Sequence, residues 1–198
     1  MPKDKSATNA KIIACMREEF LTHGYDKASL NRISAKVGIT TAGLYKHFCG
    51  KEDMFGFLVK DALDALESMQ SEGSIEMTAE DYDPFSDKVT AALIELIYEH
   101  FESWKLLVCC SAGSKYEHFE EKLIDSESAS NKQYAEILCK AGKSVKPLTE
   151  IEWHILSTEY IHLVLEIVRH CMTKEEAYRH MSFVKTLLYP GWKEIFGL

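Results

Sequence analysis

The chain has 198 residues, 46% of them hydrophobic, and a formal net charge of −8. This length and composition suffice to bury a core without an external staple, in one or two domains. The negative net charge, taken alone, argues against nucleic acid or an anionic membrane as a partner. The charge is unevenly distributed, however, because residues 1–60 carry a net +4 and the remainder −12. A basic N-terminal part on an acidic body is typical of a dedicated anion-binding module.

Cysteine spacing and the N-terminal segment bear on metal sites and localisation. The six cysteines are scattered, with no CxxC pair and no His/Cys spacing typical of zinc, so we predict reduced, mostly buried thiols and no metal or cofactor. The polar segment MPKDKSATNA lacks the apolar core of a signal peptide. No apolar run approaches the roughly 18 residues of a membrane span. We therefore expect a cytoplasmic protein.

Helical periodicity dominates the first 50 residues, and strand patterns are almost absent. Apolar side chains recur on one helical face over residues 11–20, and Gly24 is expected to close this helix. Ser29 is predicted to cap a short second helix, which ends at Gly38. Thr40 is predicted to cap a third helix. The sequence therefore predicts three helices joined by tight turns.

Longer helices are predicted beyond residue 50. The fourth runs from about 51 to 70 and gives way to an acidic loop over residues 71–83. Asp83 followed by Pro84 indicates the next helix start. Further helices are expected over residues 85–102, 104–112, 116–139, 150–171 and 174–196.

The last two of these helices have clear start signals. Thr149 and Thr173 are each followed three residues later by Glu, the pattern of a capping box. Pro190 is expected to kink or end the final helix near Tyr189.

The second and third predicted helices, with the glycine turn between them, match a helix-turn-helix. Such a motif inserts its second helix into a DNA major groove about 12 Å wide. Small or hydrogen-bonding side chains should therefore face outward near its start, while Leu44 and Phe48, four residues apart, face inward. The predicted outward residues are Thr40, Thr41, Ala42, Tyr45 and Lys46.

A wider set of residues between positions 11 and 55 shares one characteristic spacing. Its members are Phe20, Gly24-Tyr25, Ile33-Ser34, Gly38-Ile39-Thr40, Gly43-Leu44-Tyr45, His47-Phe48 and Lys51-Glu52. In this combined spacing the segment resembles the DNA-binding domain of the TetR family of bacterial transcriptional regulators. Ser34 stands where the family usually has Ala, and Gly50 where it commonly has Ser or Asn. We therefore expect a weaker cap on the fourth helix.

The resemblance implies an all-α fold, with a helix-turn-helix DNA-binding domain at residues 1–50 and a helical effector-binding and dimerisation domain at residues 51–198. It implies a homodimeric, non-enzymatic repressor that binds a palindromic operator and is released by a small-molecule effector. It also implies that Thr40, Tyr45, His47 and Lys51 contact phosphates, whereas Thr41, Ala42 and Lys46 face base edges. The alternative for Tyr45, His47 and the lysines is an ordinary solvated surface.

The final two helices are the expected dimer surface. Their apolar residues are Ile151, Leu156, Ile161, Leu165 and Val168 on one helix, and Met181, Val184, Leu187, Leu188 and Trp192 on the other. The alternative is that both are core helices of a monomer. Candidate effector contacts, chosen by polarity and position, are Trp104, Tyr134, His154 and Glu159.

A polar stripe on the helix over residues 150–171 leaves other functions open. His154, Thr158 and His162 recur every four residues, followed by Glu166 and His170. We expect an exposed face on which Glu166 pairs with both His162 and His170. Effector contact is a second possibility, and a helical enzyme or metal-binding protein using His154, His162 and Glu166 is a third.

Two further alternatives concern the thiols and the helix-turn-helix. The neighbouring Cys109 and Cys110 suggest a redox sensor, but an apolar pair of core thiols is the commoner explanation. The chain could also be a helical interaction module that keeps the helix-turn-helix shape without binding DNA.

Overall fold

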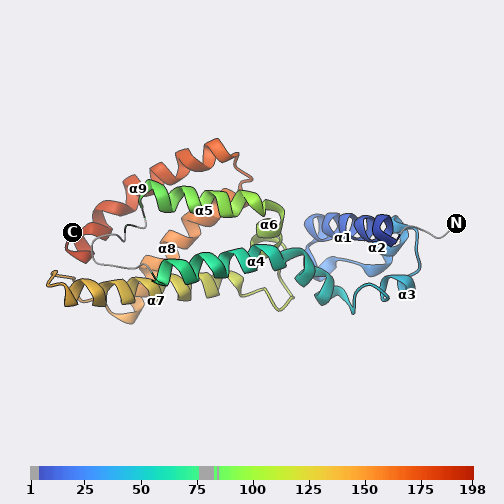
Figure 1. The fold of residues 1–198 in the computed structure, drawn as a ribbon, viewed down its shortest axis with the longest axis horizontal. Coiled ribbons are helices and arrows are strands. Elements are labelled where there is room, and N and C mark those ends of the chain that lie inside the picture. The colour runs from blue at the N-terminus through green and yellow to red at the C-terminus, as the bar shows by residue number, and fades with distance from the viewer. Residues whose placement is uncertain (1–4, 76–82, 84) are drawn as a thin grey trace. The chain divides into compact units, whose positions relative to one another are not determined.

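The protein is all helical over the residues that its computed structural model describes, which are 5–75, 83 and 85–198 (Figure 1). No strand occurs among these residues. The helices are α1 (Lys5–Lys27), α2 (Leu30–Val37), α3 (Thr41–Leu44), α4 (Lys51–Ile75), α5 (Asp87–Glu99), α6 (Phe101–Cys109), α7 (Phe119–Lys140), α8 (Glu150–Arg169) and α9 (Lys174–Phe196). The predicted all-α class is confirmed.

The helices form two compact units. The N-terminal unit comprises Met1–Leu63 and His100–His118, and the C-terminal unit comprises Asp64–Glu99 and Phe119–Leu198. Helix α4 contributes residues to both units. The predicted domain boundary at residue 50 stays a prediction.

An apolar core holds the N-terminal unit together. Its aromatic centre has Phe55 in edge-on contact with Phe20 at 5.2 Å and with Tyr25 at 5.4 Å between ring centroids. Burial of each such side chain contributes roughly 1.5–3 kcal/mol. The apolar residues that the helical pattern placed inward are indeed buried: Ile12, Met16, Phe20, Ile33, Val37, Leu44 and Phe48.

The segment of residues 100–118 packs within the N-terminal unit, which the sequence did not predict. The backbone N–H of Tyr25 donates to the carbonyl of Cys110 at 2.8 Å. The hydroxyl of Ser103 donates to the carbonyl of Leu58 at 2.7 Å. Both bonds satisfy buried or half-buried backbone groups, so they fix the ends of α1 and α6 to each other and α6 to α4.

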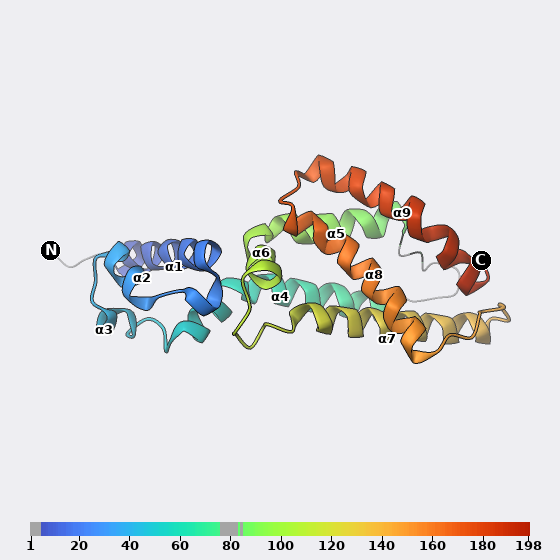
Figure 2. The same cartoon turned by 180° about the vertical axis from the view of Figure 1, so that it is seen from behind.

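The C-terminal unit is a bundle in which α7 packs against α8, and α9 packs against α5 and α8 (Figures 1 and 2). Its core contains a run of aromatic rings. Tyr134 stacks on Trp192 at a centroid distance of 5.7 Å, and Trp192 contacts Phe196 at 4.4 Å. These rings connect α7 with the last two turns of α9.

Two helix starts in the C-terminal unit agree with the sequence and one does not. Both capping boxes, at Thr149 and Thr173, are formed. Helix α5 begins at Asp87 instead of directly after Asp83, because the Ser86 hydroxyl accepts the N–H of Val89 at 3.3 Å and so caps the helix. The predicted loop also begins too early, since α4 continues to Ile75. Residues 76–82 and 84 lie outside the described residues.

Helix α9 continues through Pro190 to Phe196, so the prediction that it could end near Tyr189 is wrong, whereas a kink there stays a prediction. Proline costs a helix one hydrogen bond and a steric clash. Here the buried rings of Trp192 and Phe196, both after Pro190, anchor the final turns of the helix in the core. Tertiary packing outweighs the local preference.

None of the helices in the described ranges is long and apolar enough to cross a membrane.

Candidate functional site

The turn between α2 and α3 is built by two local devices. Gly38 ends α2 in the left-handed conformation (φ 82°, ψ 36°), which glycine adopts without steric cost, and its N–H donates to the carbonyl of Ser34 at 2.9 Å. The hydroxyl of Thr40 then accepts the N–H of Gly43 at 3.0 Å and caps α3. The predicted helix-turn-helix is therefore formed, although α3 is a single turn that ends at Leu44.

Four of the predicted DNA-contacting residues lie exposed on α3 and the turn that follows it. They are Ala42, Tyr45, Lys46 and His47, and Tyr45 is 54% exposed. In the part of the chain that the structure describes, no hydrogen bond or ion pair engages the side chains of Tyr45, Lys46 or His47. These three side chains are available to an external partner.

Thr41 differs from its neighbours because its hydroxyl is already engaged. Its Oγ1 donates to Oδ1 of Asn31 at 3.0 Å and lies 3.3 Å from Oγ of Ser34. These contacts tie α3 to α2, so base recognition by Thr41 requires its methyl group or an exchange of hydrogen bonds. The base-edge role of Thr41 stays a prediction.

Lys51 lies at the start of α4, turned toward the end of α1. Its Nζ donates to the carbonyl of Asp26 at 3.1 Å and lies 4.5 Å above the ring centre of Tyr25. The first N–H groups of α4 and its dipole favour an anion at the same place. A phosphate contact from Lys51 remains compatible with this position and is a proposal.

The weak cap predicted at Gly50 has a substitute. The carboxylate of Asp53 accepts the N–H of Cys49 at 2.8 Å, reaching back over the first turn of α4. The signal for this bond in the sequence is an acidic residue, Asp53, three positions after the uncapped Gly50.

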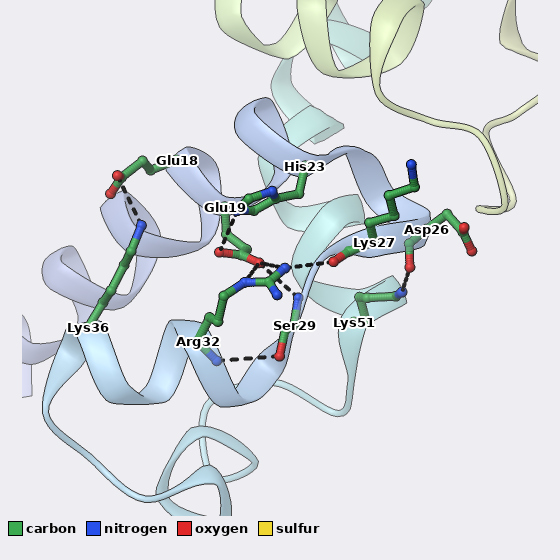
Figure 3. A network of polar contacts seen from close by, with 9 residues as sticks. All are labelled: Glu18, Glu19, His23, Asp26, Lys27, Ser29, Arg32, Lys36 and Lys51. Atoms are coloured by element: carbon green, nitrogen blue, oxygen red, sulfur yellow. Dashed lines mark hydrogen bonds and ion pairs between the residues drawn. The ribbon is translucent and has the colours of Figure 1, made fainter.

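A buried carboxylate fixes α2 to α1 (Figure 3). Glu19 is 0% exposed, and its Oε1 accepts the N–H of Ser29 at 2.9 Å and Nε of Arg32 at 2.7 Å. Burial alone would raise the pKa of Glu19, but the bonds from Arg32 and Ser29 outweigh it and hold that pKa below its usual value. Arg32 also donates to the carbonyl of Lys27 at 2.7 Å. The network sets the position from which α2 supports α3.

The four candidate effector contacts are divided between the two units. Trp104 lies buried in the N-terminal unit, and Tyr134 is buried against Trp192 in the C-terminal unit. His154 lines an open polar groove between α7 and α8, and Glu159 is exposed. Their role as effector contacts stays a prediction.

The histidine stripe forms surface ion pairs, one as predicted and one not. Nε2 of His170 lies 2.8 Å from Oε2 of Glu166. His162 instead pairs with Glu120 of α7, at 2.9 Å, because Arg169 and His170 occupy Glu166. Within the described residues no three His, Cys, Asp or Glu side chains are grouped so as to hold a metal ion.

The prediction of mostly buried thiols is wrong. None of the six cysteines is in a disulfide, and four are exposed: Cys49, Cys109, Cys139 and Cys171. Cys110 is buried, and burial raises the pKa of its thiol. Its thiol is therefore less reactive than one with the ordinary cysteine pKa.

The predicted dimer surface needs correction at the residue level. Leu165 and Val184, at its centre, are 1% and 0% exposed and belong to the core of the C-terminal unit. The same holds for Ile161, Val168, Met181 and Trp192. The large apolar side chains that α8 and α9 do expose are Ile151, Ile155, Tyr178, Phe183 and Leu187.

Comparison with known proteins agrees with this geometry. Residues 12–56 match the family model for bacterial regulatory proteins of the tetR family. This segment, which contains the helix-turn-helix, is therefore similar to the DNA-binding domain of the TetR family of bacterial transcriptional regulators. An HTH-type transcriptional regulator of Staphylococcus aureus strain USA300 is 24% identical over 127 residues, which is 64% of this chain and 66% of that protein. The match thus spans just under two thirds of that relative's length.

Solved structures of TetR-family regulators share the fold. One from Chloroflexus aurantiacus has a TM-score of 0.60 at 16% identity, covering 98% of this chain and 90% of its own. One from Syntrophomonas wolfei has a TM-score of 0.56 at 22% identity, covering 93% and 96%. AibR, solved in complex with isovaleryl coenzyme A and operator DNA, has a TM-score of 0.54 at 18% identity, covering 90% and 96%.

Proposed function

We propose that this chain is a TetR-family repressor that binds a palindromic operator as a homodimer and is released by a small-molecule effector. The observation that carries the proposal is the exposed group Ala42, Tyr45, Lys46 and His47, which lies on α3 and the turn after it and is anchored by the buried Leu44. Small and hydrogen-bonding side chains at the start of such a helix suit a major groove.

The chemistry of each side chain suggests whether it contacts a base or a phosphate. Lys46, in the turn that follows α3, contacts a base edge, where a cation favours guanine O6 and N7. Tyr45, His47 and Lys51 contact phosphates and set the register without choosing the sequence. Thr40 holds the turn through its cap and presents the first amides of α3.

The exposed apolar residues of α8 and α9 support the homodimer. Ile151 and Ile155 are four residues apart on α8, as are Phe183 and Leu187 on α9, so each pair lies on one helical face. Both members of each pair are more than half exposed in the protomer. A second copy of the chain would cover them, and two recognition helices would then read two half-sites.

Effector release needs a difference in effector affinity between the conformation that fits DNA and one that does not. Two segments of the chain connect the units and can transmit such coupling. Helix α4 belongs to both units, and residues 100–118 belong to the N-terminal unit although both neighbouring segments belong to the C-terminal unit.

Selection of bound duplexes from a random pool tests the proposal. The purified full chain should enrich an inverted repeat whose half-sites are about one helical turn apart. Enrichment of an unrepeated site would contradict the homodimer. Failure to enrich any sequence would contradict operator recognition and favour the interaction module.

A further inference from the structure

The C-terminal unit contains a small cavity among α7, α8 and α9. Three aromatic side chains line it, Phe85, Tyr160 and Trp192, together with two leucines. Two polar side chains of α7, Glu127 and Asn131, complete the lining. Its volume is about 10 Å³, which is the space of about one water molecule.

The polar lining is rich in acceptors and short of donors. Asn131 is 2% exposed, and its Nδ2 donates to Oε1 of Glu127 at 3.2 Å. Its Oδ1 is buried and has no hydrogen-bond partner among the described residues. No basic side chain of the described residues pairs with Glu127. Burial raises the pKa of Glu127 to about 7, although the bond from Asn131 works against the rise.

The aromatic lining adds further negative potential. Phe85 meets the ring of Tyr160 at 5.6 Å and 76°, and that of Trp192 at 6.0 Å and 74°. All three rings line the cavity, and aromatic rings attract cations through their π faces. A partly desolvated carboxyl, an unsatisfied amide oxygen and several rings therefore surround one small volume.

We propose that this cavity is the effector site and that its ligand is an organic monocation with an apolar body. The cationic group faces Glu127 and Asn131, and the apolar part lies among Phe85, Tyr160 and Trp192. The assignment rests on the proposed function, whose effector it places in a chemical class.

Other occupants fit the lining less well. An anion meets the carboxylate of Glu127 with no compensating cation among the described residues. A single water satisfies Oδ1 of Asn131 in the closed state but supplies no charge to Glu127. A metal ion lacks a third ligand, because no group of three metal-binding side chains occurs in the described residues.

Binding requires the cavity to enlarge, since about 10 Å³ is far smaller than such a ligand. Tyr160 and Leu188 are half-buried and have room to move, whereas Phe85, Asn131 and Trp192 are buried. The liganded conformation therefore differs from this one in the contacts of α8 and α9. That difference gives the ligand unequal affinity for two states, as coupling demands.

Two matched probe pairs test the charge preference on the full chain by titration calorimetry. One is benzyltrimethylammonium against its uncharged carbon isostere neopentylbenzene, and the other is tetraphenylphosphonium against tetraphenylborate. We expect at least one cation to bind about tenfold or more tightly than its counterpart. At pH 7 cation binding should also release protons, because it favours the ionised form of Glu127. Proton release appears as a binding enthalpy that depends on the ionisation enthalpy of the buffer.

Two variants on α7 locate the binding. Glu127→Gln should abolish both the cation preference and the proton release. Glu136→Gln, an exposed position that lines the open groove, should retain both. Far-ultraviolet circular dichroism checks that each variant is folded. The site would be overturned if Glu127→Gln bound the cations as tightly as the unmodified chain does. It would also be overturned if the unmodified chain preferred the cation in neither probe pair.

The regulatory part is tested separately with the duplex enriched from the random pool. We expect the bound cation to weaken operator binding in the unmodified chain and not in Glu127→Gln. Cation binding without any change in operator affinity would overturn the effector role. Loss of operator binding in the unliganded chain would contradict the proposed function instead, and the calorimetry would still decide the site.

Discussion

The hydroxyl of Tyr25 donates a hydrogen bond of 2.7 Å to Oε2 of Glu52, joining the end of α1 to the first turn of α4. The second oxygen of the same carboxylate accepts the N–H of Lys115 at 3.2 Å. Burial, followed by the bond to Glu52, raises the pKa of Tyr25 to about 12, so the phenol remains a donor over the physiological range. One carboxylate thus connects three segments of the N-terminal unit.

Tyr25→Phe should destabilise the protein by about 1–2 kcal/mol, because it removes a largely buried hydrogen bond to a charged acceptor. Urea denaturation followed by circular dichroism measures the change. Tyr45→Phe is the matched control, since Tyr45 is exposed, and it should leave stability unchanged. Equal stability of Tyr25→Phe and the unmodified chain would show that the bond adds nothing.

Glu19→Gln should cost about 2–3 kcal/mol at pH 7, since Arg32 then loses its buried counter-charge. The folded-state pKa of Glu19 is lowered, so its stabilising contribution is present above its ordinary value of 4.5 and is lost as pH falls through the folded pKa. The difference between variant and unmodified chain should therefore shrink at pH 3. Glu18→Gln, an exposed neighbour paired with Lys36, should show little effect at either pH. A pH-independent cost would contradict the ionic account.

Local chemistry explains which parts of the fold the sequence predicts. The turn at Gly38 and the capping boxes at Thr149 and Thr173 depend on residues adjacent in the chain, and all are formed. Pro190 misleads because its local cost is offset by rings that pack from other helices.

The sequence likewise predicts some features of the candidate sites and not others. Tyr45 and Lys46 are exposed as the inward positions of Leu44 and Phe48 predict, although all of Tyr45, Lys46 and His47 lie in the turn after α3. The carboxylate of Glu19 and the cavity at Glu127 could not be predicted, because their partners lie 10 or more residues away or on other helices. Periodicity also does not distinguish a helix face buried in the core from one buried in a dimer interface. Leu165 and Val184, expected in the dimer interface, therefore lie in the core.

Glu127→Gln should make the protein more stable at pH 8, and less so at pH 5. Because the folded pKa is raised from 4.5 to about 7, the carboxyl costs nothing below about pH 4.5, and its cost grows up to about pH 7. The full cost is up to about 3 kcal/mol for a shift of this size. Thermal unfolding of both proteins from pH 5 to 8 measures it, with Glu136→Gln as the exposed control. A stability difference that does not grow with pH would refute the raised pKa.

Phe183→Glu and Leu187→Glu should produce folded monomers, because each places a charge on an exposed apolar face that a second copy would bury. Sedimentation velocity reports the association state and circular dichroism the fold. Ser182→Glu, exposed and about 100° around the same helix from Phe183, should remain dimeric. Val184→Glu should unfold instead, since Val184 is core. If Phe183→Glu and Leu187→Glu both remained folded dimers, the dimer interface would lie elsewhere.

The specificity of Lys46→Ala tests the central claim, that α3 reads DNA sequence, most directly. Fluorescence anisotropy measures the affinity for the selected operator and for a scrambled duplex at several salt concentrations. The proteins compared are the unmodified chain, Lys46→Ala, Lys51→Ala and Lys122→Ala. Lys46→Ala should lose about 1–3 kcal/mol on the operator and much less on the scrambled duplex. Lys51→Ala should weaken both equally and lower the salt slope by about one. Lys122→Ala, which removes an exposed charge on α7, should change neither. Equal losses on both duplexes for Lys46→Ala would contradict base recognition by α3.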